Sequence, residues 1–132
     1  ILNIKLRYLE EYSAARNKMA AYYDAAFSTI IELDIPKRQH NSTHVFHQYT
    51  IKITNGKRDE LHQHLLNNGI PNAIYYPVPL HAQKAYQDNR YQEDDFNTTN
   101  ELIETVISLP MHTELDKEQL TFITKTINDF VG

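Results

Sequence analysis

Apolar residues recur at close to helical spacing over residues 1–30. The recurring positions are Leu2, Leu6, Leu9, Ala20, Tyr23 and Phe27. Charged and polar side chains fill the other faces, and a period near 3.6 residues is typical of an amphipathic α-helix. The pattern therefore predicts one long helix over residues 1–33. The polar stretch 35–43, which contains Pro36, predicts an exposed connection after it.

The pattern changes to alternation between His44 and Thr54. One face of an extended chain would carry Val45, His47, Tyr49, Ile51 and Ile53. A period of two residues is typical of a half-buried strand, so we expect the first strand here. The Asn55–Gly56 pair, a common turn sequence, would end it.

Helical and extended patterns alternate over the rest of the chain. Leucines at helical spacing predict a helix over Arg58–Asn68, and Gly69 followed by Ile70 is typical of a left-handed C-terminal cap. The last helix is predicted by a capping box between Asp116 and Gln119 and by apolar residues at helical spacing that follow it in the sequence. The other predicted segments are a strand at Asn72–Tyr76 stopped by Pro77 and Pro79, helical pieces at Leu80–Tyr86 and Asn97–Thr105, a mobile loop at Gln87–Asp95 and a strand at Val106–Leu109.

This order of elements predicts an α/β fold in a single domain over residues 1–132, a length usual for one domain. We expect the long helix over residues 1–33 and a small α/β unit over residues 44–132. Helices would cover a short antiparallel or mixed sheet. Because the chain opens at Ile1 without a methionine and already inside the amphipathic pattern, we expect it to be a C-terminal fragment of a longer protein.

The composition narrows the range of functions. Hydrophobic residues make up 41% of the chain, which is enough to form a core, and the formal net charge is -4. An acidic chain is a poor match for a protein that binds nucleic acid through its phosphates. The chain has no cysteine, no apolar run long enough to span a membrane and no signal-peptide pattern. We therefore expect a cytoplasmic protein without nucleic-acid or membrane partners.

The histidines do not predict a metal site. His40, His44 and His47 lie across a loop and a strand, where residues three apart point to opposite faces. His62 and His64 are two apart on a predicted helix, unlike the i, i+4 pair of a zinc-binding helix. With no cysteine to complete a site, we expect no bound metal.

Two features could carry chemistry. His47 interrupts an apolar strand face, so it either is a hydrogen-bonded, half-buried histidine or lines a site. Residues 74–86 place Tyr75 and Tyr76 at a strand end, follow them with a rigid proline pair, and then supply His81 and Gln83. Aromatic faces and hydrogen-bonding groups on a stiff loop suit a polar ring such as a sugar. The residues leave open the alternative that the tyrosines only pack.

The order and spacing of several motifs are similar to those of a known enzyme family. The motifs are His44–Ile51, Arg58–Leu61, Gly69–Pro71, Tyr76–His81 and Ser108–His112. Together they resemble the C-terminal part of the DegT/DnrJ/StrS-type nucleotide-sugar aminotransferases, and the resemblance covers nearly the whole chain. These are enzymes of the aspartate-aminotransferase fold (fold type I) that use pyridoxal phosphate to place an amino group on a nucleotide-linked keto-sugar.

The resemblance implies a division of labour within a longer parent enzyme. It implies a homodimer that takes nitrogen, most often from glutamate, for surface polysaccharide synthesis, and whose large N-terminal domain carries the Schiff-base lysine and most cofactor-binding groups. The catalytic centre would then lie outside this chain, which alone would be inactive. The resemblance makes Tyr75, Tyr76 and His81 candidates for substrate contact, and Gln83 and His47 candidates for lining positions. Tyr75 stands where many family members have histidine, which bears on the identity of the sugar.

A second interpretation needs no catalysis. The chain could be a stand-alone α/β module that binds a ligand or a protein, with residues 74–86, the tyrosine-proline loop, as its pocket. An upstream reading frame that encodes a lysine-bearing domain would favour the enzyme, and a short gene that begins near Ile1 would favour the module.

Overall fold

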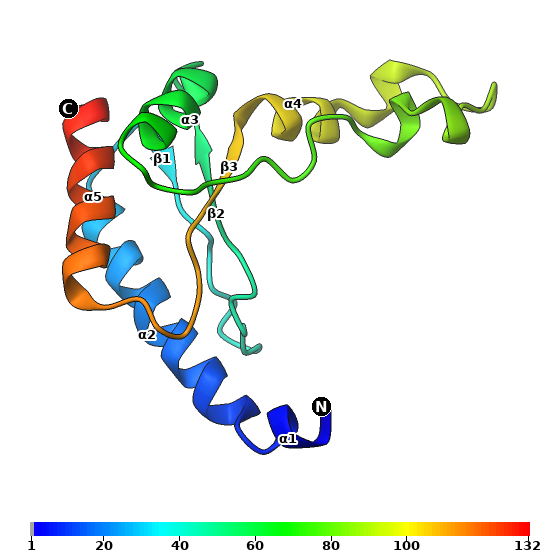
Figure 1. Cartoon of the computed structure of the whole chain (residues 1–132). Coiled ribbons are helices and arrows are strands. Elements are labelled where there is room, and N and C mark those ends of the chain that lie inside the picture. Colours follow the sequence, from blue (N-terminus) through cyan, green and yellow to red (C-terminus); the bar gives the residue numbers. More distant parts are fainter. Residues whose placement is uncertain (1) are drawn as a thin grey trace.

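A computed structural model describes residues 2–132, so Ile1, the first position of the predicted helix, lies outside the described residues. Five α-helices and three strands are formed (Figure 1). They are α1 (Leu2–Leu6), α2 (Leu9–Phe27), β1 (Leu33–Asp34), β2 (Tyr49–Ile53), α3 (Arg58–Asn67), α4 (Asn97–Thr105), β3 (Val106–Leu109) and α5 (Lys117–Val131). Short 3₁₀ helices lie at η1 (Leu80–Ala82), η2 (Lys84–Tyr86) and η3 (Glu93–Phe96).

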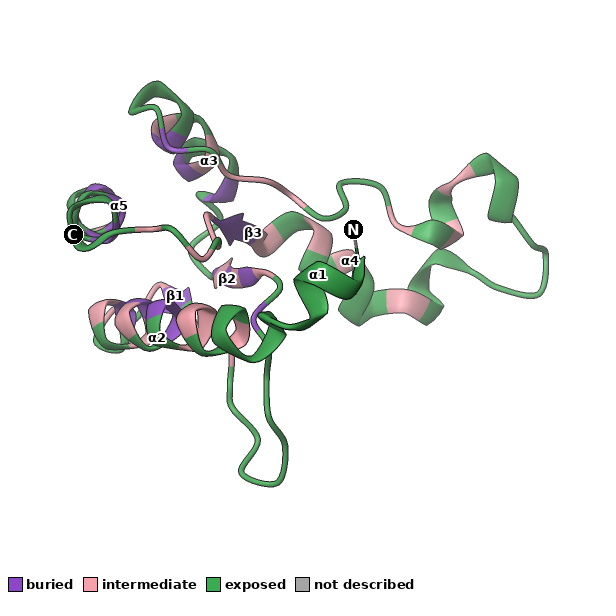
Figure 2. Cartoon of the chain, turned by 60° about the horizontal axis from the view of Figure 1, so that its bottom comes forward, coloured by how far each residue is buried: buried purple, intermediate pink, exposed green. Residues whose placement is uncertain are grey.

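The three strands form an antiparallel sheet in the order β1-β2-β3, which confirms the predicted α/β class and the short sheet. Tyr49 pairs with Leu109 and Ile51 with Ile107, so the apolar positions of β2 and β3 lie on one face. That face packs into a buried core with residues of α2, α3 and α5, which Figure 2 shows around the sheet. On the other face, the hydroxyls of Thr50 and Ser108 share a hydrogen bond of 2.8 Å.

The prediction of one continuous helix over residues 1–33 is wrong. A turn at residues 7 and 8 separates α1 from α2, and α2 ends at Phe27. Leu33 is buried and pairs with Ile53, so the end of the predicted helix is instead the edge strand β1. Strand pairing with a distant segment outweighs the local helical spacing there. At the other end, Leu2 and Leu6 have exposed fractions of 81% and 66%, and α1 buries no residue.

The first predicted strand is correct only in its second half. Tyr49, Ile51 and Ile53 are buried as expected, but β2 begins at Tyr49 rather than at His44. Phe46 has a positive φ of 46°, which breaks the alternation because the chain changes direction there. Phe46 is therefore buried, whereas His47 is exposed. The expectation that His47 lies on the apolar face is wrong for this reason.

The predicted strand at Asn72–Tyr76 is reduced to a single antiparallel bridge between Ala73 and Ser108. Pro71, Pro77 and Pro79 flank this position and have no N–H to extend a ladder. The strand at Val106–Leu109 and the helical pieces in the loop after the prolines are confirmed. The loop predicted at Gln87–Asp95 contains the start of η3, and its mobility stays a prediction.

The ends of α3 and α5 follow the sequence signals closely. Gly69 has a φ of 71°, its N–H donates to the carbonyl of Leu66, and the N–H of Ile70 donates to the carbonyl of Leu65. This is the Schellman arrangement, which satisfies the last carbonyls of a helix. Asp116 and Gln119 form the predicted capping box in front of α5. Both ends are therefore fixed by local chemistry.

Residues 74–105, called the arm below, project away from the sheet (Figure 1). The arm contains the tyrosine-proline loop, the three 3₁₀ helices and α4; α4 leads directly into β3 and contacts β2. None of the helices described over residues 2–132 combines the length and apolar character needed to cross a membrane.

Candidate functional site

The first hollow near the tyrosine-proline loop lies where β2 begins and β3 ends. It has a volume of about 400 Å³ and is called the sheet-end hollow below. Its polar lining side chains are His47, Gln48, Asn72, Tyr75, Ser108 and His112. No carboxylate, lysine or arginine is among the described residues that line this hollow, which offers hydrogen-bond donors and acceptors beside the Tyr75 ring.

The second hollow lies within the arm, has a volume of about 260 Å³ and is called the arm hollow. Tyr75, Tyr76 and Gln83 line it together with Val78, Pro79 and apolar residues of α4. The two tyrosine rings meet edge to face with centroids 5.7 Å apart, and their exposed fractions are 48% and 73%. Tyr75 lines both hollows, so it forms the boundary between them.

Gln83 stabilises the turn of this loop. Its Nε2 donates a hydrogen bond of 3.3 Å to the carbonyl of Val78. Gln83 lines the arm hollow and not the sheet-end hollow.

His81 lies apart from the other predicted site residues. Its ring stacks on Phe96 with centroids 4.2 Å apart and an interplanar angle of 9°, and it lines a small hollow of about 50 Å³ with Tyr86 and Tyr91. Its Nε2 is buried and has no hydrogen-bond partner among the described residues. The structure thus groups His47 with Tyr75, and Tyr75 with Tyr76 and Gln83, but does not bring His81 to either group.

Sequence reasoning missed Gln48, Asn72 and His112 as lining residues of the sheet-end hollow. The register of the sheet contains the signal that could have found them. Because Tyr49 pairs with Leu109 in an antiparallel ladder, residues just before β2 lie beside residues just after β3. His47 and His112 are therefore neighbours in space although they are far apart in sequence.

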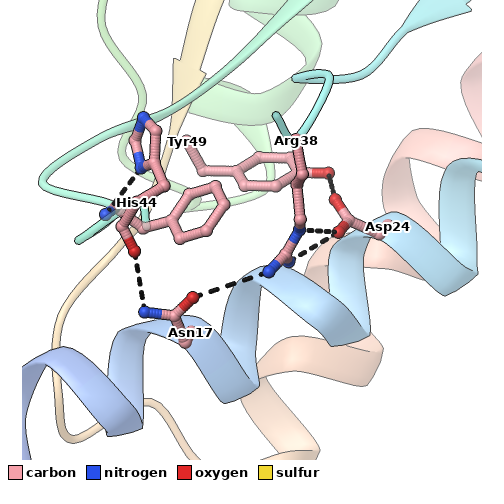
Figure 3. Close-up of polar contacts among 6 residues, drawn as sticks. Asn17, Asp24, Arg38, His44 and Tyr49 are labelled. Atoms are coloured by element: carbon pink, nitrogen blue, oxygen red, sulfur yellow. Dashed lines mark hydrogen bonds and ion pairs between the residues drawn. The ribbon is translucent and has the colours of Figure 1, made fainter. Parts of the chain in front are cut away.

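A polar network attaches the segment before β2 to α2 (Figure 3). The Tyr49 hydroxyl donates to Asp24 Oδ1 at 2.7 Å, and Arg38 forms an ion pair with the other carboxylate oxygen at 2.6 Å. Asn17 donates through Nδ2 to the carbonyl of His44 at 2.8 Å. Burial, and then the hydrogen bond to Asp24, raise the pKa of Tyr49 well above its usual range, so this hydroxyl remains a donor. The network fixes the approach of the chain to His47.

The lysines give no support for a Schiff base at these hollows. No lysine lines either hollow among the described residues. Lys52 forms an ion pair with Glu101, and this hydrogen bond raises its pKa, which keeps the amine protonated and non-nucleophilic. No group of three metal-ligating side chains is found within residues 2–132.

Comparison with known proteins gives one consistent family. The model described as the DegT/DnrJ/EryC1/StrS aminotransferase family matches residues 1–128. The chain is 36% identical over 132 residues to a pleiotropic regulatory protein of Geobacillus stearothermophilus, covering 98% of this chain and 35% of that protein. It is 35% identical to a UDP-N-acetyl-3-dehydro-alpha-D-glucosamine 3-aminotransferase of Acidithiobacillus ferrooxidans, covering 96% of this chain and 33% of that protein.

Solved structures give the same result. A DegT DnrJ EryC1 StrS aminotransferase from Brucella abortus superposes with a TM-score of 0.91 at 32% identity, covering 100% of this chain and 34% of that one. DesV of S. venezuelae in complex with a ketimine intermediate gives a TM-score of 0.92 at 26% identity, covering 98% and 34%. The chain therefore spans about a third of the length of the relatives it matches.

Proposed function

Because the chain belongs to the DegT/DnrJ/EryC1/StrS aminotransferase family, we propose that it is the C-terminal part of a sugar aminotransferase that acts on a nucleotide-linked keto-sugar. The observation that carries the proposal is the family match over residues 1–128. The relative from Acidithiobacillus ferrooxidans, named as a UDP-sugar aminotransferase, supports the substrate class. The parent would serve amino-sugar and surface polysaccharide synthesis in the cytoplasm, with glutamate as the amino donor.

The family uses pyridoxal phosphate, and the forms of the solved relatives from Streptococcus pneumoniae include one with this cofactor and one with its aminated form. When bound, the cofactor supplies the electron sink for transamination. Since no lysine lines the two hollows, we assign the Schiff-base lysine and most cofactor contacts to the other two thirds of the parent. The residues of this chain would bind and orient the sugar.

The tyrosine-proline loop is the part of this chain that we assign to substrate contact. Tyr75 and Tyr76 present exposed aromatic faces, and His47 and Gln83 add hydrogen-bonding groups. Such a surface suits a sugar ring, whose C–H faces pack on aromatic rings while its hydroxyls need donors and acceptors. His81 stays in the proposal through its place in the family motif Tyr76–His81, although the structure stacks its ring on Phe96, apart from both hollows.

The apolar side chains at the start of the chain would contact the rest of the parent. Leu2, Ile4, Leu6 and Leu9 are exposed, although apolar residues this close together usually mark an interface. The relatives are about three times as long as this chain, so residues outside it are available to cover them. We assign this surface to the parent's own large domain, within a homodimer.

Two half-reactions of the full-length parent test the proposal. Tyr75→Phe and His81→Ala should slow amino transfer to the keto-sugar nucleotide. They should leave transfer from glutamate to the cofactor unchanged, because that half-reaction needs no contact with the sugar. Losing one hydrogen bond would cost about 0.5–1.5 kcal/mol for an uncharged partner and about 1.5–3 kcal/mol for a charged one. Single-turnover spectroscopy separates the two steps.

Tyr12→Phe is the matched control, because Tyr12 lies on α2 and its ring contacts Tyr8 rather than the loop. Equal slowing of both half-reactions, or of neither, by the Tyr75 and His81 variants would show that the loop has no part in sugar binding. A full-length parent with no transaminase activity on any keto-sugar nucleotide would instead favour the ligand-binding module.

A further inference from the structure

We propose that His62 and Asn72 are positioning residues that set the place of Tyr75 between its two hollows. This inference rests on the proposed function, because it concerns how the sugar-binding loop is held. Asn72 lies two residues after Ile70, the last residue of the α3 cap, and three residues before Tyr75. His62 lies on α3 and is half-buried, as is Asn72.

The side chain of Asn72 directs both of its amide hydrogens, and one acceptor position of its oxygen, at groups within the chain. Its Nδ2 faces two carbonyl oxygens, that of Ile70 at 3.1 Å and that of His62 at 3.4 Å. Its Oδ1 lies 2.5 Å from Nδ1 of His62. Because both amide hydrogens are directed at carbonyls, Oδ1 is the acceptor and Nδ1 of His62 carries the hydrogen. Asn72 lines the sheet-end hollow but has no donor left for a ligand, so its role is to hold the backbone.

Asn72 and Ala73 stand at the start of a span with no backbone-to-backbone hydrogen bond before Pro79 among the described residues. Ala73 exchanges two backbone hydrogen bonds with Ser108, of 3.1 and 2.8 Å. Within residues 2–132, the next backbone-to-backbone hydrogen bond along the chain joins Ala82 to Pro79. Tyr75 and Tyr76 lie between these points, and the prolines that follow have no N–H. The place of Tyr75 is therefore set mainly from its N-terminal side, by Ala73 and by the Asn72 amide held on His62.

Substitutions of His62 in the full-length parent test this role. His62→Leu keeps the bulk and removes the donor, whereas His62→Asn places an amide nitrogen at the same distance along the side chain as Nδ1. We expect His62→Leu to raise KM for the keto-sugar nucleotide about two- to twelvefold, the range that one lost hydrogen bond gives, with the glutamate half-reaction unchanged. His62→Asn should return most of this increase in KM toward the native value. His64→Leu is the control, since His64 lies on the same helix and packs on Phe130.

Hydrogen exchange of the same variants gives a readout independent of turnover. In the parent, the amide of Ala73 should exchange faster in His62→Leu than in the native protein or in His64→Leu. Asn72→Asp, which places an oxygen opposite the two carbonyls, should act like His62→Leu and replaces it if that variant fails to fold. Native exchange at Ala73 together with a native KM, or equal loss in both half-reactions, would overturn the inference. If the parent has no transaminase activity, the proposed function fails while the exchange rates still decide the positioning role.

Discussion

Removing the hydroxyl of Tyr49 should destabilise the protein by about 1.5–3 kcal/mol. The Tyr49 side chain is fully buried, and its hydroxyl donates to the Asp24 carboxylate at 2.7 Å. A hydrogen bond to a charged partner contributes in this range, about twice a neutral one. Tyr49→Phe removes only the hydroxyl and leaves the ring packing with Tyr23 and Phe46 unchanged. For a domain of this size, the melting temperature should fall by roughly 5–12 °C.

The ion pair in the same network should contribute much less. The side chains of Arg38 and Asp24 have exposed fractions of 40% and 25%, and ion pairs that water reaches are typically worth about 0–1 kcal/mol. Arg38→Gln should therefore destabilise the protein by less than Tyr49→Phe does.

Urea unfolding of the native protein, Tyr49→Phe, Asp24→Ala and the double variant Tyr49→Phe/Asp24→Ala forms a double-mutant cycle, and Arg38→Gln is measured in the same way for comparison. The cycle should give a coupling of at least about 1 kcal/mol between Tyr49 and Asp24. A larger cost for Arg38→Gln than for Tyr49→Phe, or a coupling near zero, would refute the conclusion that the Asp24 carboxylate stabilises the protein mainly through its hydrogen bond with the Tyr49 hydroxyl.

Three further predictions follow from other parts of the fold. Burial raises the pKa of both Tyr23 and Tyr49, so the unfolded chain loses these protons first. The contribution of these two groups to stability should be complete below pH about 10 and should be lost above it by about 1.4 kcal/mol per pH unit for each tyrosine, measured in urea titrations at rising pH. Gly69→Ala should cost about 1–2 kcal/mol in thermal unfolding from its positive φ alone, because an added Cβ meets no atom within 4 Å; a neutral result would contradict the strain argument. Leu2→Ser with Leu6→Ser should leave the fold unchanged by circular dichroism but reduce self-association in sedimentation, and undiminished association would exclude this surface.

Local signals predicted the elements that depend on local chemistry. The cap at Gly69 and the capping box at Asp116 determine helix ends through bonds between residues a few positions apart, so the sequence alone was sufficient. β1 could not be predicted in this way, because Leu33 becomes a strand residue only by pairing with Ile53. The change of face at Phe46 was equally hidden, since a positive φ at a phenylalanine has no sequence signature.

The candidate site was predictable only in part for a related reason. Tyr75, Tyr76 and Gln83 lie within nine residues of one another, and the stiff loop keeps them around one hollow. His81 lies inside the same segment, yet its ring is directed away because Phe96 provides a flat partner on a distant part of the arm. His112 required the register of β2 with β3, which is a property of the folded sheet.

The two ends of the tyrosine-proline loop are held by different means, and this bears on how the loop could serve a sugar site. At the start of the loop, the N–H and the carbonyl of Ala73 both form hydrogen bonds with Ser108 of β3. At its far end, His81 stacks on Phe96. Between these two points the prolines fix the backbone φ angle and need no hydrogen-bond partner for an N–H, since they have none. Proline reduces the number of conformations that a free chain must lose, typically by about 0.4–1 kcal/mol per residue. A loop held in this way presents its tyrosine rings in a fixed arrangement, so it loses little conformational entropy when a ligand binds. A binding surface that another domain completes would need such a preformed loop.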